Sequence, residues 1–151
     1  MAITQLDAGD SSVAQSIWAL FQRAYKVEAT LIGARDFPPL RRTVAQVQAS
    51  QSSFYGLQRN AVLVGVVETE RQGQSLDICS LVVEPAYFGQ GCGQALMQYV
   101  IAREGDLLVK VQTAVLNVPA VKLYQKMGFS EAARYITDSE MALIQLERRP
   151  R

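Results

Sequence analysis

The residues with the clearest chemical potential are three alternating glycines, Gly89, Gly91 and Gly93. They follow an apolar run, residues 78–83, which is stopped by Pro85, and apolar residues at helical spacing come directly after them. Glycine adopts backbone dihedrals that other residues avoid, and it leaves no side chain in front of the main chain. The amides of such a turn and of the following helix start can point at one anion. The pattern predicts a strand, a phosphate-binding turn and a helix; a purely structural connection is the alternative.

Two common nucleotide-binding motifs do not fit this turn. A P-loop ends in Gly-Lys-Ser/Thr, whereas Gly93 is followed by Gln94 and Ala95. The dinucleotide-binding fingerprint is GxGxxG, whereas the spacing here is GxGxG. The chain also has no histidine, which removes Ser-His and Cys-His nucleophile pairs and the usual zinc or iron ligand sets. We therefore expect no metal, and any acid or base must be a carboxylate, Tyr, Cys, Lys or water.

A second segment with its own signals covers residues 117–129, NVPAVKLYQKMGF. Pro119 suits the first turn of a helix, where its missing amide hydrogen would have no partner. One face of that helix is apolar and carries Ala120, Leu123, Tyr124 and Met127. Gly128 is placed to end the helix in a left-handed conformation. The preceding residues, 107–115, have the composition of a strand.

Together, the two segments resemble the GNAT superfamily of acyl-CoA-dependent N-acyltransferases. In that family a strand ending V-x-P leads into a turn R/Q-x-x-G-x-G/A and a helix, and a later Asn precedes a helix of the form PAxxLYxxxGF. The matching residues here are Val83, Pro85, Gly89, Gly91 and Gly93, and then Asn117, Pro119, Ala120, Leu123, Tyr124, Gly128 and Phe129. One position departs from the pattern, because Phe88 stands where the family usually has Arg or Gln.

The resemblance implies that acetyl-CoA is the cofactor. The backbone of Leu81, Val82 and Val83 would hold the pantetheine arm, and Asn117 would touch the arm from the other side. The amides of a six-residue stretch would hold the pyrophosphate at the helix N-terminus: Gly89, Gln90, Gly91, Cys92, Gly93 and Gln94. Residues 85–98 contain no Lys or Arg. We therefore expect Lys122 or Lys126 to supply positive charge, although a solvated helix face explains both lysines equally well.

The reaction that the resemblance implies is direct transfer of an acetyl group from a thioester to a primary amine. Tyr124 lies where the family commonly places the general acid for the leaving thiolate; packing beside Leu123 is the alternative. A phenol, at a pKa of about 10, is about 1.5 units too weak to protonate a thiolate of pKa about 8.5 completely, so we expect a hydrogen bond or a concerted transfer. Asp77 is the first candidate for the general base and Glu68 the second. Both suit a solvent-facing strand equally well, and a chain of waters would need neither.

The acceptor amine would be bound by the segments outside the two motifs. By resemblance, Tyr25, Glu28 and Asp36 could line its cleft, and the two acids would suit a cationic amine. Arg35, Arg41 and Arg42 weakly favour an acceptor that also carries a carboxylate. A surface helix and a polar loop explain all six residues as well. The acceptor can be a small molecule or a peptide: the sequence does not decide among a peptide N-terminus, lysine, a polyamine, an amino sugar and a small metabolite.

These residues would be positioned by an α+β fold, because the pattern predicts a mixed, mostly antiparallel sheet with helices on both faces. Residues 3–6, 54–57 and 61–68 are expected to be strands, with a closing hairpin over 131–137 and 141–146. Asp10, Ser11 or Ser12 can cap a first helix, Thr43 a short second one through Gln48, and residues 30–40 look irregular. By resemblance, the strands at 78–83 and 107–115 run parallel and splay apart at their ends.

The composition is that of one soluble domain spanning residues 1–151. Half of the residues are apolar (49%), and 15 basic residues balance 14 acidic ones, so no strong field would attract nucleic acid or an anionic membrane. No apolar run is long enough for a membrane span and the start has no signal-peptide features, so we expect a cytoplasmic protein. Its two cysteines, Cys79 and Cys92, are expected to be packing residues without a disulfide. The sequence leaves open whether the chain forms a homodimer.

Two other classes of function share some of these features. A non-catalytic acyl-CoA-binding or sensing module on the same fold would use the glycine turn but would not need Tyr124. An interaction protein would use the glycine turn only as a structural connection.

Overall fold

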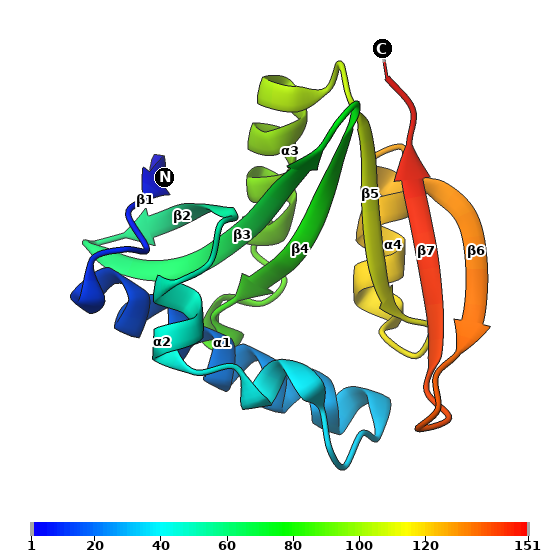
Figure 1. Ribbon diagram of the computed structural model, residues 1–151, viewed down its shortest axis with the longest axis horizontal. Helices are drawn as coiled ribbons and strands as arrows, with labels where there is room; N and C mark the ends of the chain where they lie inside the picture. Colours follow the sequence, from blue (N-terminus) through cyan, green and yellow to red (C-terminus); the bar gives the residue numbers. More distant parts are fainter. Residues whose placement is uncertain (1, 151) are drawn as a thin grey trace.

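The computed structural model describes residues 2–150, which form one seven-stranded sheet with helices on both faces (Figure 1). The strand order is β1-β2-β3-β4-β5-β7-β6, and only β4 and β5 are parallel neighbours. The strands are β1 (Ala2–Leu6), β2 (Ser53–Arg59), β3 (Val62–Gln72), β4 (Ser75–Val83), β5 (Leu108–Ala114), β6 (Ser130–Ile136) and β7 (Ala142–Arg148). The helices are α1 (Ser11–Ile32), α2 (Val44–Gln48), α3 (Cys92–Glu104) and α4 (Val118–Lys126), with short 3-10 turns η1 (Pro38–Arg41) and η2 (Pro85–Tyr87). The predicted α+β architecture is confirmed.

The first helix, α1, is the longest element of the described chain, and it is longer than the sequence predicted. Asp10 caps it, since the side chain accepts a hydrogen bond from the Ser12 amide at 2.9 Å. The irregular segment was expected from residue 30, but the helix continues to Ile32. Ile32 and Phe37 of the following loop are buried in one cluster, and this packing stabilises the additional turn. Gly33 then ends the helix with a left-handed φ of 70°.

Two hydrophobic cores cover the two faces of the sheet. On one face, α3 and α4 pack against the strands, and Leu96, Met97 and Val100 of α3 are almost fully buried there. On the other face, the apolar stripe of α1 packs over β2, β3 and β4 through residues such as Ile17, Leu20 and Phe21. The sheet therefore separates α1 from α3 and α4.

The sheet opens between its two parallel strands. β4 and β5 pair only between Ser75–Ile78 and Leu108–Val111, and beyond this point each strand continues paired with its other neighbour alone. A bulge at Cys79 marks the change, because Ile78 pairs with Thr69 and Ser80 with Glu68, which leaves Cys79 outside the register. Figure 1 shows the two strands diverging toward the end of the sheet that α1 crosses. The predicted splay is confirmed.

The hairpin of β6 and β7 closes the sheet, as predicted, and its turn is fixed by the Thr137 amide, which donates to the Met141 carbonyl at 2.9 Å. Within residues 2–150, no helix is both long and apolar enough to cross a membrane. The same described residues contain no group of three or more His, Cys, Asp or Glu side chains that could hold a metal ion.

Candidate functional site

The glycine turn lies between η2 and α3, at the open end of β4. Gly89 and Gly91 have left-handed φ angles of 76° and 80°, and a Cβ at either position would meet nothing within 4 Å, so the space in front of both is open. Gly91 is also the N-cap of α3, where no side chain caps the first amides and no acidic residue lies in the first turn. Gly93 allows close packing, because a Cβ there would lie 3.2 Å from Leu123. This is the geometry of an anion-binding helix start.

Two cations reach this turn from other elements. Arg59, at the end of β2, donates from Nη1 to Oε1 of Gln90 at 2.8 Å, and its guanidinium lies over the ring of Tyr87. Lys126, in the last turn of α4, donates from Nζ to Oε1 of Gln94 at 3.1 Å. Phe88 is half exposed and offers neither charge nor hydrogen bond from its side chain. The positive charge that residues 85–98 lack is therefore brought in by β2 and α4.

The strand edge next to the turn faces the opening. Leu81, Val82 and Val83 lie in the part of β4 that has β3 as its neighbour on one side and no strand on the other. Val82 is buried under α1, whereas Leu81 and Val83 pack toward α3. Backbone groups on the free edge of these residues are available to an extended ligand, in the way that a sheet edge accepts another strand.

Tyr124 reaches the opening from α4. It is 5% exposed, and its ring packs against Phe129 with centroids 5.8 Å apart. Burial raises the pKa of its hydroxyl above the ordinary tyrosine value, and the neighbouring Tyr25 and Glu28 raise it further. Tyr25 and Glu28 belong to α1, on the other face of the sheet, so their charges act on Tyr124 across the opening. The Tyr124 hydroxyl stays protonated at neutral pH.

Asn117 joins α4 to α1 across the same opening. It is buried, and its Oδ1 accepts a hydrogen bond from the Ala120 amide at 3.3 Å, which makes it the N-cap of α4. Its Nδ2 donates to Oε1 of Glu28 at 2.6 Å. Burial raises the pKa of Glu28, an effect that the hydrogen bond from Asn117 partly offsets.

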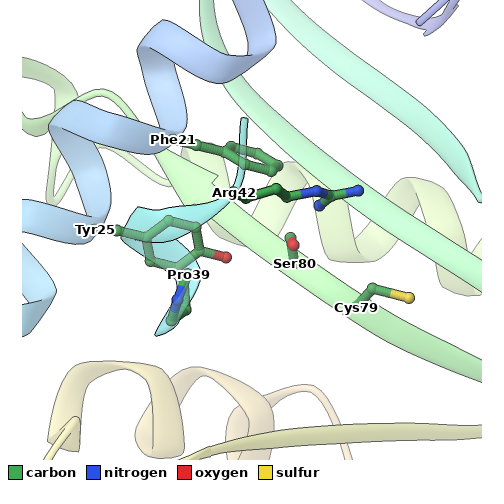
Figure 2. Close-up of a pocket in the computed structure, with 6 residues that line it drawn as sticks. All are labelled: Phe21, Tyr25, Pro39, Arg42, Cys79 and Ser80. Carbon is green, nitrogen blue, oxygen red and sulfur yellow. The ribbon is translucent and has the colours of Figure 1, made fainter. Parts of the chain in front are cut away.

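A cavity of about 200 Å³ lies beside this group on the α1 face of the sheet (Figure 2). It is lined by Phe21, Tyr25, Pro39, Arg42, Cys79 and Ser80. Figure 2 shows the Tyr25 hydroxyl directed toward Ser80, and Arg42 above the same serine. A larger hollow, of about 470 Å³, lies along α1 at Lys26, Val27, Thr30 and Leu31, but one helix alone lines it and it gathers no converging polar groups.

A buried ion pair holds one wall of the cavity. Arg42 donates two hydrogen bonds to Glu68, from Nη1 to Oε1 at 2.7 Å and from Nη2 to Oε2 at 2.9 Å. Ser80 donates to Oε1 of Glu68 at 2.9 Å, and the Tyr25 hydroxyl hydrogen-bonds Ser80 in turn. Burial alone would raise the pKa of Glu68, but the hydrogen bonds from Arg42 and Ser52 outweigh it, so the pKa lies below the ordinary value. Glu68 is ionised at neutral pH and its oxygens are occupied.

The structure brings together four of the residues expected at the site, Tyr25, Glu28, Asn117 and Tyr124. It leaves two others apart. Asp77 lies where β4 and β5 are still paired, in register with Lys110, and Asp36 is exposed and pairs with Arg41 at 3.5 Å.

Three contributions were missed from the sequence: Arg59 at the turn, Ser80 in the cavity wall and the pairing of Arg42 with Glu68. Ser80 had a signal, since it is a hydroxyl residue within the apolar run 78–83. Arg42 was considered as a ligand for a carboxylate on the acceptor, but that charge is already matched by Glu68. Cys79 points away from Tyr25 in Figure 2. Burial and the charges of Glu68, Glu70 and Asp77 raise the pKa of its thiol to about 12.

Comparison with known families gives one family for the chain. Residues 50–131 match the model of the Acetyltransferase (GNAT) domain. The UPF0157 protein YqkA of Bacillus subtilis (strain 168) is 40% identical over 124 residues, which cover 82% of this chain and 36% of that protein. The chain therefore spans about a third of the length of this relative.

Two further similarities extend over most of both chains. The [Ribosomal protein bS18]-alanine N-acetyltransferase of Escherichia coli (strain K12) is 27% identical over 112 residues, or 72% of this chain and 74% of that protein. The crystal structure of PaiA N-acetyltransferase from Thermoplasma acidophilum, in complex with coenzyme A, aligns over 99% of both chains with a TM-score of 0.75 at 14% identity. At 14% identity, the similarity to the Thermoplasma acidophilum structure shows a shared fold only.

Proposed function

The chain belongs to the GNAT acetyltransferase family, and from this premise we propose that it transfers the acetyl group of acetyl-CoA to a primary amine. The coenzyme would lie on the α3 and α4 face with its thioester in the opening between β4 and β5. The acceptor would enter from the α1 face. One observation carries the proposal: the glycine turn and the free edge of β4 border the same opening, and Tyr124 of α4 lies close enough to Tyr25 and Glu28 of α1 to interact with them electrostatically across it.

The open glycine turn and the uncapped start of α3 support pyrophosphate binding by the backbone amides from Gly89 to Gln94. Arg59 and Lys126 add positive charge there, which makes up for Phe88. Leu81, Val82 and Val83 would hold the pantetheine arm by their backbone. Asn117 would contact the arm with the second hydrogen of its amide nitrogen, since the first is donated to Glu28.

We assign to Tyr124 the role of general acid toward the thiolate. Its raised pKa keeps the proton on the hydroxyl, which is the state that can donate. The same shift makes complete transfer to a free thiolate more unfavourable than for an ordinary phenol. The proton would therefore be donated as the carbon–sulfur bond breaks, or be shared in a hydrogen bond.

The acceptor is proposed to be a cationic primary amine, with Tyr25 and Glu28 in its cleft. Asp36 remains a candidate contact for the outer part of a larger acceptor, because its side chain is exposed on the connection after α1. The name of the E. coli relative makes an N-terminal alanine the first acceptor to test. Asp77, the first general-base candidate from the sequence analysis, would act on an amine in the opening only through a water molecule.

Two measurements test the function in sequence. Isothermal titration with acetyl-CoA should give saturable one-site binding, which an interaction protein with a structural glycine turn would lack. Thiol release is then followed with a peptide carrying an N-terminal alanine, with lysine, with spermidine and with glucosamine, and products are identified by mass. Acetylation of at least one amine is expected. Tight binding of acetyl-CoA with no transfer to any of them would favour the sensing module.

A further inference from the structure

Glu28 is a carboxylate that interacts with Asn117, Tyr25 and Tyr124, and its surroundings differ from those of Glu68 and Asp77. It projects from α1 and is half-buried, and its Oε1 is held by Nδ2 of Asn117 at 2.6 Å. Asn117 is itself fixed, because it is buried and caps α4. The carboxylate is therefore aimed by a rigid helix start on the opposite side of the opening.

Glu28 lies close to both tyrosines of the opening. Its charge raises the pKa of Tyr25, on its own helix, and of Tyr124, on α4. The charges of the Arg42–Glu68 ion pair also act on Tyr25, in opposite directions. Among the described residues, the salt bridges do not include Glu28, so no cation matches its charge as Arg42 matches that of Glu68.

We propose that Glu28 is the general base that takes the proton from the ammonium group of the acceptor, and that Asn117 is the positioning residue that aims it. The inference rests on the proposed function and names the base for that reaction. An incoming ammonium group supplies the positive charge that Glu28 lacks. The bound cation then passes its proton to the Glu28 carboxylate. Burial makes the ionised form of this carboxylate less favourable, so it accepts the proton more readily.

Glu28 and Tyr124 together account for every proton transferred in the reaction. Glu28 takes one proton from R–NH₃⁺, and the nitrogen lone pair forms the bond to the thioester carbonyl carbon. As the tetrahedral intermediate collapses, the carbon–sulfur bond breaks and the sulfur receives the Tyr124 proton. The second proton lost by the nitrogen restores the Tyr124 hydroxyl, and Glu28 releases its proton to solvent. The net products are the acetamide, CoA-SH and one H⁺.

The other carboxylates fit this role less well. Among the described residues, five hydrogen bonds reach Glu68, two of them from Arg42, and its lowered pKa makes it a weak base. Asp77 lies on the closed side of the bulge, where β4 and β5 are still paired. Glu28 replaces Asp77 as the base that this geometry favours.

The test compares Glu28→Gln with the native protein, using the fastest acceptor of the four-amine panel. Glutamine keeps the oxygen that accepts from Asn117, so the variant is expected to fold. Without a base, only amine that is already neutral reacts, which for an α-amine of pKa about 8 is about a tenth at pH 7. For the peptide with an N-terminal alanine, we expect kcat/KM to fall about tenfold or more at about pH 7 and less than about threefold at about pH 9.5. Lysine, which is more basic, should show the larger loss. Both tyrosines stay neutral over this range.

Two variants and one control separate catalysis from structure. Asn117→Asp keeps the cap oxygen of α4 but loses the donor to Glu28. Its kcat/KM should therefore be lowered at about pH 7 and recover at about pH 9.5, as in Glu28→Gln. Glu28→Asp should restore part of the rate. Lys26→Gln, on the exposed side of the same helix, should leave the pH profile unchanged. A loss in Glu28→Gln that is equal at both pH values, or that appears only in the KM of the acceptor, overturns the proposal.

A second readout does not depend on activity. Carboxyl-labelled glutamate is followed by carbon NMR against pH, and the resonance missing from Glu28→Gln is assigned to Glu28. It should titrate above the ordinary glutamate value of about 4.3; titration at or below that value overturns the proposal. Acetyl-CoA titration of Glu28→Gln and Glu28→Asp should be unchanged. If the native protein itself neither binds acetyl-CoA nor acetylates an amine, the proposed function has failed, independently of the NMR result on Glu28.

Discussion

At the scale of single residues, two glutamates on the α1 face of the sheet have opposite surroundings. Glu68 is almost fully buried and ionised, because Arg42 and three serines donate to it. Glu28 is half-buried, has one neutral donor, and has its pKa raised. The first arrangement stabilises the fold, whereas the second leaves a charge that a cationic ligand can match.

Glu68→Gln should destabilise the protein by about 3 kcal/mol at neutral pH, because it leaves Arg42 partly buried without its matching charge. The pKa of Glu68 is lowered by folding, so its contribution is present above the ordinary value of about 4.3 and is lost as the pH falls through the lower native value. Urea unfolding of both proteins at several pH values measures this. The exposed Glu70→Gln on the same strand is the control; equal midpoints for the two variants would contradict the account.

Tyr124→Phe should lower kcat by about 100-fold or more, since a general acid is lost from the departing sulfur. Affinity for acetyl-CoA should stay nearly the same, because the ring packing against Phe129 is kept. Tyr99→Phe, on α3 and packed against Tyr55, is the matched control. Steady-state rates and calorimetric titration measure the two effects. Full kcat in Tyr124→Phe, with the chemical step limiting, would remove Tyr124 from the mechanism.

Arg59→Gln should weaken acetyl-CoA binding several-fold, since a partly exposed charge near a phosphate contributes about 1 kcal/mol. The difference from the native protein should shrink as salt is added, because salt screens exposed charges. Arg71→Gln, near the end of β3, serves as the comparison. Calorimetric titration at low and high salt measures both; an unchanged dissociation constant at low salt would show that Phe88 is not compensated by Arg59.

At the scale of elements, the turn between η2 and α3 is the part whose backbone shape is needed for binding. Gly91→Ala puts a Cβ on a left-handed residue, at a cost of about 1–2 kcal/mol in stability, and shifts the first amides of α3. Affinity for acetyl-CoA should fall with it. Gly73→Ala, at φ 62° in the turn between β3 and β4, should cost similar stability and leave affinity intact. Thermal unfolding and titration together give the comparison, and equal affinities in both variants would argue against phosphate binding at this turn.

Elements with local signals could be predicted from the sequence. The glycine turn, the capping box of α2 between Thr43 and Gln46, and the Pro119 start of α4 all depend on neighbouring residues. The last turn of α1 depends instead on Phe37, after the end of the helix, and it was missed. The same holds for the site. Glu28 and Asn117 are 89 residues apart, and no local pattern indicates that their side chains meet.

At the scale of the whole molecule, the sheet divides the site between two sets of elements. The family match covers residues 50–131, which include the glycine turn, the splayed strands and Tyr124. Helix α1 lies before that match, on the face of the sheet with the cavity, and it carries Tyr25 and Glu28 (Figures 1 and 2). Arg42, which also lines the cavity, precedes the match as well. We therefore expect cofactor binding to follow the family, and choice of acceptor to depend on residues 2–49.

We propose that the thioester meets the amine in the opening between β4 and β5, and a crystal structure with bound acetyl-CoA would show whether it does. We expect the pyrophosphate on the amides from Gly89 to Gln94 and the thioester sulfur within hydrogen-bond reach of the Tyr124 hydroxyl, with Glu28 on the far side of the carbonyl. Coenzyme bound elsewhere, or a sulfur that cannot reach Tyr124, would contradict it.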